Sequence, residues 1–170
     1  AHEYIAGLQE MCEENDLKLW LENYGHWGFP GEFLMYGGQA DLLAGEFWTT
    51  EELGNIECRA AASAAHIYGK NVVYAESFTS ANEDNPFSSY PEKMKKRGDW
   101  SFAEGINHVV YHVYIHQPYE DKFPGVNAWF GTEINRKNTW FELAAPWMKY
   151  HQRCNYLLQQ GTYVADIAYY

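Results

Sequence analysis

The sequence contains few cysteines and no long apolar run. The number of cysteines is odd, and their positions, Cys12, Cys58 and Cys154, follow no disulfide or zinc-ligand spacing. We therefore expect the cysteines to act as small buried apolar side chains. No stretch approaches the roughly 18 apolar residues of a membrane-spanning helix. A secretory signal peptide is missing as well. The chain starts inside a predicted helix, and we interpret its first residues as an internal cut.

Positive charge is also scarce. Twelve Lys and Arg residues stand against 23 Asp and Glu residues, a formal net charge of −11. The basic residues are scattered, except for one short cluster at positions 93–97. This balance argues against nucleic acid and anionic membrane surfaces as partners, because both attract basic proteins.

Aromatic residues, in contrast, are abundant. They make up 18% of the chain, with seven Trp and fourteen Tyr. Aromatic rings stack on the apolar faces of sugars and carboxylates accept hydrogen bonds from sugar hydroxyls, so this combination suggests carbohydrate binding. An aromatic-rich core would give the same composition, and composition alone leaves both interpretations open.

Apolar periodicity predicts alternating helices and strands. Helices are expected over residues 4–15, 49–69, 91–98 and 139–161, and strands over 18–24, 41–48, 70–79, 107–116 and 164–168. Two capping-box patterns, Thr49 with Glu52 and Thr139 with Glu142, mark helix starts. Gly69, Gly98 and Gly161 mark helix ends, Pro91 fits a first helical turn, and Pro146 marks a kink.

Two segments, 25–38 and 117–138, show no convincing periodicity and are predicted loops. A loop as long as the second is usually a binding or lid element, although it could equally be a protein interface. The βα alternation predicts an α/β fold with a parallel sheet, part of a (β/α)8 barrel. A complete barrel needs roughly 250 residues. Residues 1–170 are therefore expected to form a single segment, about half of a barrel and truncated at both ends.

Three carboxylates, Glu22, Glu46 and Glu76, each lie near the end of a predicted strand, at intervals of 46 − 22 = 24 and 76 − 46 = 30 residues. One βα unit has about this length, so all three acids are expected at one rim of the barrel. Glycoside hydrolysis needs two carboxyl groups across the scissile bond. Clustered acids also raise one another's pKa or bind a hard cation such as calcium. For any single acid, a structural ion pair is the alternative.

Other polar and aromatic residues are candidates for binding sugar. His112 and His116 lie on one face of a predicted strand, but about 13 Å of chain separates them, too far to share a metal. Trp48, Trp129 and Glu133 are further candidates for substrate contacts. Ser77, beside Glu76, is not surrounded by the G-x-S-x-G pattern of a nucleophile elbow.

Several longer motifs, which together cover nearly the whole chain, resemble the α-L-rhamnosidases of glycoside hydrolase family 106. These motifs are Glu22-Asn23-Tyr24-Gly25, Gly45-Glu46-Phe47-Trp48, the Ala-rich run 59–69, Ala75-Glu76-Ser77-Phe78-Thr79, Gly105-Ile106-Asn107-His108 and His112-Val113-Tyr114-Ile115-His116-Gln117-Pro118.

The resemblance implies a (β/α)8 catalytic domain that hydrolyses terminal α-L-rhamnosides with inversion and uses calcium to hold the sugar. It implies that Glu76 is the general base and that Glu46 is the acidic partner near calcium and sugar, with Glu22 in the same cluster. The general acid is then expected upstream of residue 1, in the remainder of the barrel, and this segment alone should not turn over substrate. The natural partner is a rhamnose-containing glycan or glycoside, and the expected compartment is periplasmic or extracellular in a bacterium.

Two other functions remain open at this point. The chain could be a non-catalytic carbohydrate-binding or scaffold piece that keeps an aromatic cleft without the chemistry. It could also belong to a glycosidase of another specificity, such as a β-galactosidase with a similar barrel. Titration with rhamnose and a panel of aryl glycosides separate these possibilities.

Overall fold

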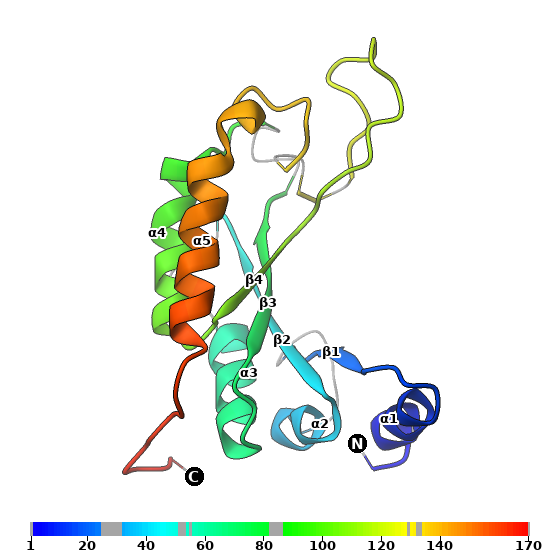
Figure 1. Ribbon diagram of the computed structural model, residues 1–170, viewed down its shortest axis with the longest axis vertical. Helices are drawn as coiled ribbons and strands as arrows, with labels where there is room; N and C mark the ends of the chain where they lie inside the picture. Colours follow the sequence, from blue (N-terminus) through cyan, green and yellow to red (C-terminus); the bar gives the residue numbers. More distant parts are fainter. Residues whose placement is uncertain are drawn as a thin grey trace.

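The computed structural model describes residues 2–24, 32–50, 54, 56–81, 87–128, 130–131 and 134–169. Its centre is a four-stranded sheet with the order β1-β2-β3-β4, in which every neighbouring pair is parallel (Figure 1). The strands are β1 (Trp20–Glu22), β2 (Leu42–Trp48), β3 (Val73–Thr79) and β4 (His108–Tyr111). The predicted α/β class and parallel sheet are therefore confirmed.

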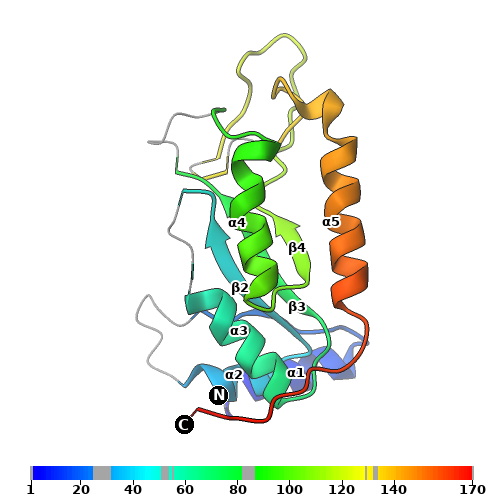
Figure 2. The same ribbon diagram turned by 90° about the vertical axis from the view of Figure 1, so that its left-hand side faces the viewer.

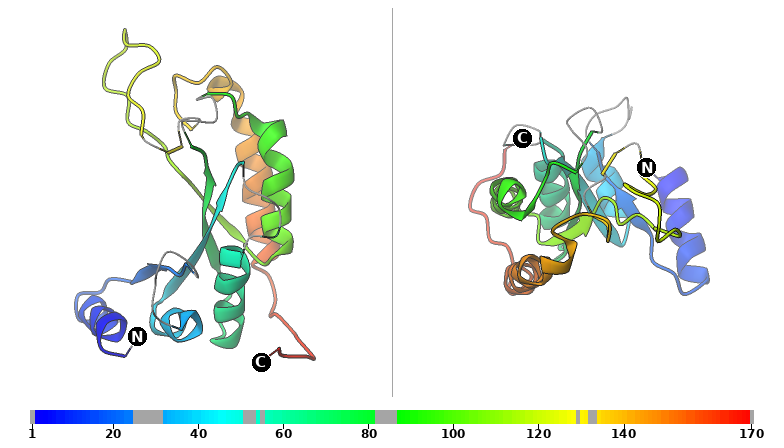
Figure 3. Two further views of the ribbon diagram at one scale, coloured as in Figure 1. Left: turned by 180° about the vertical axis from the view of Figure 1, so that it is seen from behind. Right: turned by 90° about the horizontal axis from the view of Figure 1, so that it is seen from above.

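Helices alternate with these strands along the chain. They are α1 (Tyr4–Glu14), α2 (Phe33–Gln39), α3 (Ile56–Ile67), α4 (Pro91–Ala103) and α5 (Ala145–Leu158), with a short 3-10 turn, η2 (Phe141–Leu143). The three helices α3, α4 and α5 lie on the same side of the sheet, as Figures 1 and 2 show. Figure 3 shows the same arrangement from behind and from above. This arrangement of strands and helices is consistent with one section of a (β/α) barrel.

The hydrophobic core lies between the sheet and this helix layer. Leu43 and Phe47 of β2 and Ala75 of β3 are fully buried there. The alanines of α3 are buried as well, because their small side chains let the helix approach the sheet closely. Gly69 ends α3 with a positive φ of 66°, as predicted.

The backbones of β2 and α3 approach each other closely at Gly45. A Cβ atom at this position would lie 2.6 Å from the carbonyl oxygen of Glu57 and 3.2 Å from Cα of Cys58, both backbone atoms of the helix. We therefore expect Gly45→Ala to push α3 away from the sheet and to lower the free energy of unfolding by about 1–3 kcal/mol. Scanning calorimetry of the full-length protein that carries this chain measures the effect.

Gly7 of α1 provides the matched control. A Cβ atom at Gly7 would meet no atom within 4 Å, so Gly7→Ala should stabilise by roughly 0.5–1 kcal/mol through helix propensity alone. Equal effects of the two substitutions would show that the close approach at Gly45 does not matter.

Phe78 interrupts the regular alternation of β3. The pairing with β2 shifts between Phe47 and Trp48, so that Trp48 pairs with Thr79, and Phe78 is the extra residue. Its φ of 66° is rare for a bulky side chain. The bulge places the Phe78 ring in the helix-facing core, 4.9 Å from the ring of Phe47. The bulge also moves the next residue, Thr79, to the sheet face opposite to the one that regular alternation would give it.

Several helix boundaries differ from the prediction. Residues 33–39 form α2 within the predicted loop 25–38, where the Glu32 side chain accepts from the backbone amides of Leu34 and Met35. Residues 25–31 lie outside the described part of the chain. Gly98 does not end α4, which continues to Ala103; the missing side chain instead accommodates the Phe78 ring.

The predicted capping box of Thr49 with Glu52 includes a residue, Glu52, that lies outside the described part of the chain. Thr49 donates its hydroxyl to the carbonyl of Phe78, and α3 is described from Ile56. The second predicted capping box, at Thr139, caps no helix. The helix predicted from Thr139 begins at Ala145, after the 3-10 turn η2, and ends at Leu158, before Gly161. Pro146 occupies its first turn, where proline is tolerated, so no kink is needed.

Two predicted strands also differ from the structure: one is shorter than predicted, and the other does not form. The strand predicted over 107–116 ends at Tyr111, and residues 164–168 form no strand. Residues 117–128, 130–131 and 134–138 contain no helix or named strand, as expected for a loop. The three cysteines are free, with Cys58 buried. Within the described residues, every helix is too short or too polar to cross a membrane.

Candidate active site

The three predicted carboxylates share the sheet face that points away from α3, α4 and α5. Glu46 of β2 and Glu76 of β3 are direct partners across the sheet. Glu22 of β1 pairs with Ala44, two residues before Glu46, and therefore faces the same side. Glu22 ends β1, Glu46 lies just past the middle of β2 and Glu76 lies at the middle of β3, so parallel pairing brings all three acids together on this face.

Glu76 is held through both carboxylate oxygens. The hydroxyl of Tyr24 donates to Oε2 at 3.0 Å, and the hydroxyl of Thr79 donates to Oε1 at 2.6 Å. Nδ1 of His112 lies 3.5 Å from Oε1. The side chain of Glu76 keeps 18% of its surface exposed. Its carboxylate is thus fixed in orientation and still accessible.

Glu46 is more buried, with 9% of its surface exposed. The indole N–H of Trp48 donates to its Oε1 at 2.5 Å. The Trp48 ring packs edge-on against Phe130, with 5.2 Å between ring centroids. Trp48, predicted to contact substrate, thus has a second task, because it orients the Glu46 carboxylate. Its contact with a sugar stays a prediction.

The electrostatics show how closely the acids are grouped. Burial raises the pKa of Glu22, and the negative charge of Glu76 raises it further, while Tyr24 and His112 act in the opposite direction. Burial, together with the charges of Glu76, Glu46 and Glu22, raises the pKa of Tyr24 far above its ordinary value. The Tyr24 phenol therefore stays protonated and acts as a hydrogen-bond donor at any working pH.

The other predicted contact residues have different positions. His112 directly follows β4, and its buried Nδ1 has no hydrogen-bond partner among the described residues, which leaves it available next to Glu76. His116 is exposed beyond the end of β4, because the strand does not continue as predicted. Trp129 and Glu133 lie outside the described residues.

A calcium ion needs several oxygen ligands that converge on one point. Within the part of the chain that the structure describes, no three His, Cys, Asp or Glu side chains converge in an arrangement that could hold a metal ion. Glu46, the predicted ligand, already accepts a hydrogen bond on Oε1. These residues do not form a calcium site by themselves. Calcium therefore stays a prediction from the family resemblance, and we assign no catalytic step to it.

The segment after β4 forms a long loop that extends well beyond the sheet, coloured yellow-green in Figure 1. Its base is closed by Gln117, whose side chain donates to the carbonyl of Val126 at 2.7 Å and accepts from its amide at 2.9 Å. Arg136 pairs with Glu120 at 2.6 Å and also donates to the Gln117 carbonyl. The loop is thus cross-linked by its own side chains.

Tyr24 and Thr79, the two donors to Glu76, were not among the predicted site residues. Tyr24 follows Glu22 by two residues, so period-two alternation already placed it on the face of the acids. Thr79 follows Glu76 by three residues, which in a regular strand would put it on the opposite face. Only the bulge at Phe78 returns it to the side of Glu76. The sequence offered a signal for Tyr24 and none for Thr79.

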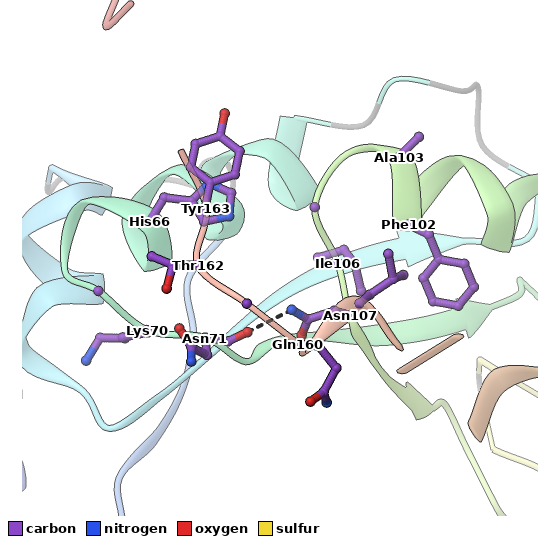
Figure 4. Close-up of a pocket in the computed structure, with 14 residues that line it drawn as sticks. His66, Lys70, Asn71, Phe102, Ala103, Ile106, Asn107, Gln160, Thr162 and Tyr163 are labelled. Atoms are coloured by element: carbon purple, nitrogen blue, oxygen red, sulfur yellow. Dashed lines mark hydrogen bonds between the residues drawn. The ribbon is translucent and has the colours of Figure 1, made fainter. Parts of the chain in front are cut away.

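A separate pocket of about 350 Å³ lies at the opposite end of the strands. It is lined by residues that precede β3 and β4, such as Asn71 and Asn107, and by the segment after α5 (Figure 4). Asn107 donates to the carbonyl of Asn71 there, and Tyr163 stacks on His66 at 3.6 Å. None of the three acids lines this pocket, so the candidate chemistry lies elsewhere.

Comparison with known proteins agrees with this arrangement. A curated relative from Formosa agariphila, named "Putative beta-glucuronidase", is 36% identical over 168 residues, which is 98% of this chain and 14% of the relative. The solved structure of a rhamnosidase from Novosphingobium sp. PP1Y matches with a TM-score of 0.88 and 36% identity, over 98% of this chain and 16% of that chain. The chain thus spans about one seventh of the length of these proteins.

The match to a family sequence model extends over the whole chain, whereas each of the motifs covers only a few residues. The sequence model of glycoside hydrolase family 106, described as alpha-L-rhamnosidase, matches residues 1–170. The expected resemblance is therefore confirmed, and the chain belongs to the α-L-rhamnosidase family of glycoside hydrolases.

Proposed function

We propose that this chain supplies the base-bearing part of the active site of an inverting α-L-rhamnosidase, within a larger (β/α)8 domain. The observation that carries the proposal is the environment of the Glu76 carboxylate. Two hydroxyl donors fix its carboxylate, Glu46 lies directly opposite on the next strand, and the side chain stays partly exposed. A general base needs this combination of fixed orientation and access to water.

In the proposed reaction, Glu76 accepts a proton from a water molecule while that water attacks the anomeric carbon. The bond from the anomeric carbon to the leaving oxygen breaks, and a general acid protonates that oxygen. Inversion requires acid and base on opposite faces of the sugar. The acid is expected from a part of the barrel outside residues 1–170. Glu46 and Glu22 border the position of the sugar in this scheme.

The acidic cluster also bears on the class of sugar. The name of the Formosa agariphila relative favours a β-glucuronidase as a second candidate function. A glucuronide, however, carries its own carboxylate, and this negative charge would be placed beside Glu22, Glu46 and Glu76. Negative charges that lie close together repel one another. A rhamnoside is neutral and avoids this cost, which supports the rhamnosidase.

The test is a panel of aryl glycosides offered to the full-length protein that carries this chain. We expect hydrolysis of the aryl α-L-rhamnoside, with β-L-rhamnose as the first product in NMR spectra recorded during turnover. Faster hydrolysis of the aryl β-glucuronide would favour the second function. Retention of configuration would contradict the role of Glu76. Rhamnose binding without hydrolysis of any glycoside would support a non-catalytic module instead.

A further inference from the structure

Tyr24 occupies the centre of the acidic cluster. Tyr24 lies two residues beyond the end of β1, and its side chain extends past β2, so that the hydroxyl reaches Glu76 on β3. Burial and the charges of all three acids act on this one phenol. The phenol has one proton to donate; its oxygen lies 3.0 Å from Oε2 of Glu76, and Glu22 is a second hydrogen-bond partner of the same hydroxyl.

Thr79 holds the other oxygen of the same carboxylate. Thr79 is buried, with 1% of its surface exposed, and its hydroxyl lies 2.6 Å from Oε1. The contact exists because Phe78 adopts a positive φ and turns Thr79 towards Glu76. Non-glycine residues in this conformation cost free energy and persist at functional sites where the surrounding structure supports them.

From this geometry we infer that Tyr24 and Thr79 are positioning residues for the catalytic base: each fixes one oxygen of Glu76, and together they set the plane of its carboxylate. This inference rests on the proposed function, because it assumes that Glu76 is the base. Two hydrogen bonds from different elements leave the carboxylate one orientation. A base fixed in this way can direct a free lone pair at the attacking water without reorganising during the reaction.

The neighbours of the carboxylate agree with a positioning role. Glu22, Glu46 and His112 surround the same group from β1, β2 and the end of β4. Without its two hydroxyl partners, Glu76 could rotate towards His112, whose Nδ1 already lies 3.5 Å from Oε1. Loss of either hydroxyl should therefore change the rate of the chemical step rather than the binding of the sugar.

The experiment compares Tyr24→Phe, Thr79→Val and Thr79→Ser in the full-length protein with an aryl α-L-rhamnoside as substrate. We expect Tyr24→Phe and Thr79→Val each to lower kcat by about 10- to 100-fold with little change in KM. Thr79→Ser keeps the hydroxyl and should restore most of kcat. Tyr156→Phe, a change to an exposed tyrosine of α5, is the matched control and should leave kcat unchanged.

Three results would overturn the inference. They are an unchanged kcat in Tyr24→Phe, a loss in Thr79→Val that Thr79→Ser shares, and a rise in KM that accounts for the whole loss of kcat/KM. Glu76→Gln is measured in parallel. If this variant stays active, the proposed function itself fails; if it is inactive while Tyr24→Phe and Thr79→Val are fully active, only the positioning role is wrong.

Discussion

Replacing Glu76 by glutamine is expected to lower kcat of the full-length enzyme by about 10²–10⁴-fold, the usual contribution of a general base. Glutamine keeps the shape of the side chain, and its oxygen can still accept a hydrogen bond from Tyr24 or Thr79. It cannot take a proton from the attacking water. KM for an aryl α-L-rhamnoside should therefore change little, and steady-state kinetics separate the two parameters.

Rescue by a small anion makes this prediction specific. In Glu76→Ala, azide can attack the anomeric carbon without giving up a proton, and we expect it to restore turnover with a β-L-rhamnosyl azide as product. Glu92→Gln, a change to an exposed acid in the first turn of α4, is the matched control and should retain full activity. Full activity of Glu76→Gln would exclude Glu76 as the base.

The second large effect is expected on stability. Phe47 is fully buried between β2 and the helix layer, 4.9 Å from the ring of Phe78 and 5.3 Å from the guanidinium carbon of Arg97. Phe47→Ala removes this packing and leaves a cavity between the sheet and the helices, so the free energy of unfolding should fall by about 3–5 kcal/mol. Scanning calorimetry of the full-length protein, with loss of hydrolysis followed in parallel, identifies the transition that belongs to this domain.

Phe123 provides the matched control on the same chain. It lies in the long loop after β4 with 74% of its surface exposed. Phe123→Ala should therefore change the free energy of unfolding by less than about 0.5 kcal/mol. Comparable losses for Phe47→Ala and Phe123→Ala would contradict the assignment of the core to the layer between β2, β3 and the helices.

The sequence predicted each of the strands β1 to β4 along the chain and the location of Glu22, Glu46 and Glu76 on the same side of the sheet, but it missed α2 and added a strand at 164–168. β2 and β3 are long, apolar and bounded by clear helix and turn signals, so both strands and the grouping of Glu46 and Glu76 could be predicted; their direct pairing across the sheet comes from the structure. The Ala-rich helix before Gly69 was equally clear. The family resemblance added the chemistry, because strand ends alone do not distinguish a general base from a structural acid.

The remaining differences have local causes. Thr139 has the right spacing for a capping box with Glu142, but the chain forms the 3-10 turn η2 at this point and α5 begins only at Ala145. Gly98 looks like a helix end, yet its lack of a side chain accommodates the Phe78 ring. The partnership of Thr79 with Glu76 depends on the backbone conformation of Phe78. Strict alternation along a strand cannot predict a bulge.

The cross-links of the loop after β4 affect how this part of the molecule can take part in binding. The side chain of Gln117 holds Val126 at two points, and Arg136 holds Glu120. The backbone between Gln117 and Val126 has thus already lost conformational entropy on folding, at roughly 1–2 kcal/mol for each ordered residue. A glycan that contacts it would not have to order it again. We therefore expect recognition at this loop to have a smaller entropic penalty than recognition by a loop that becomes ordered only with its ligand.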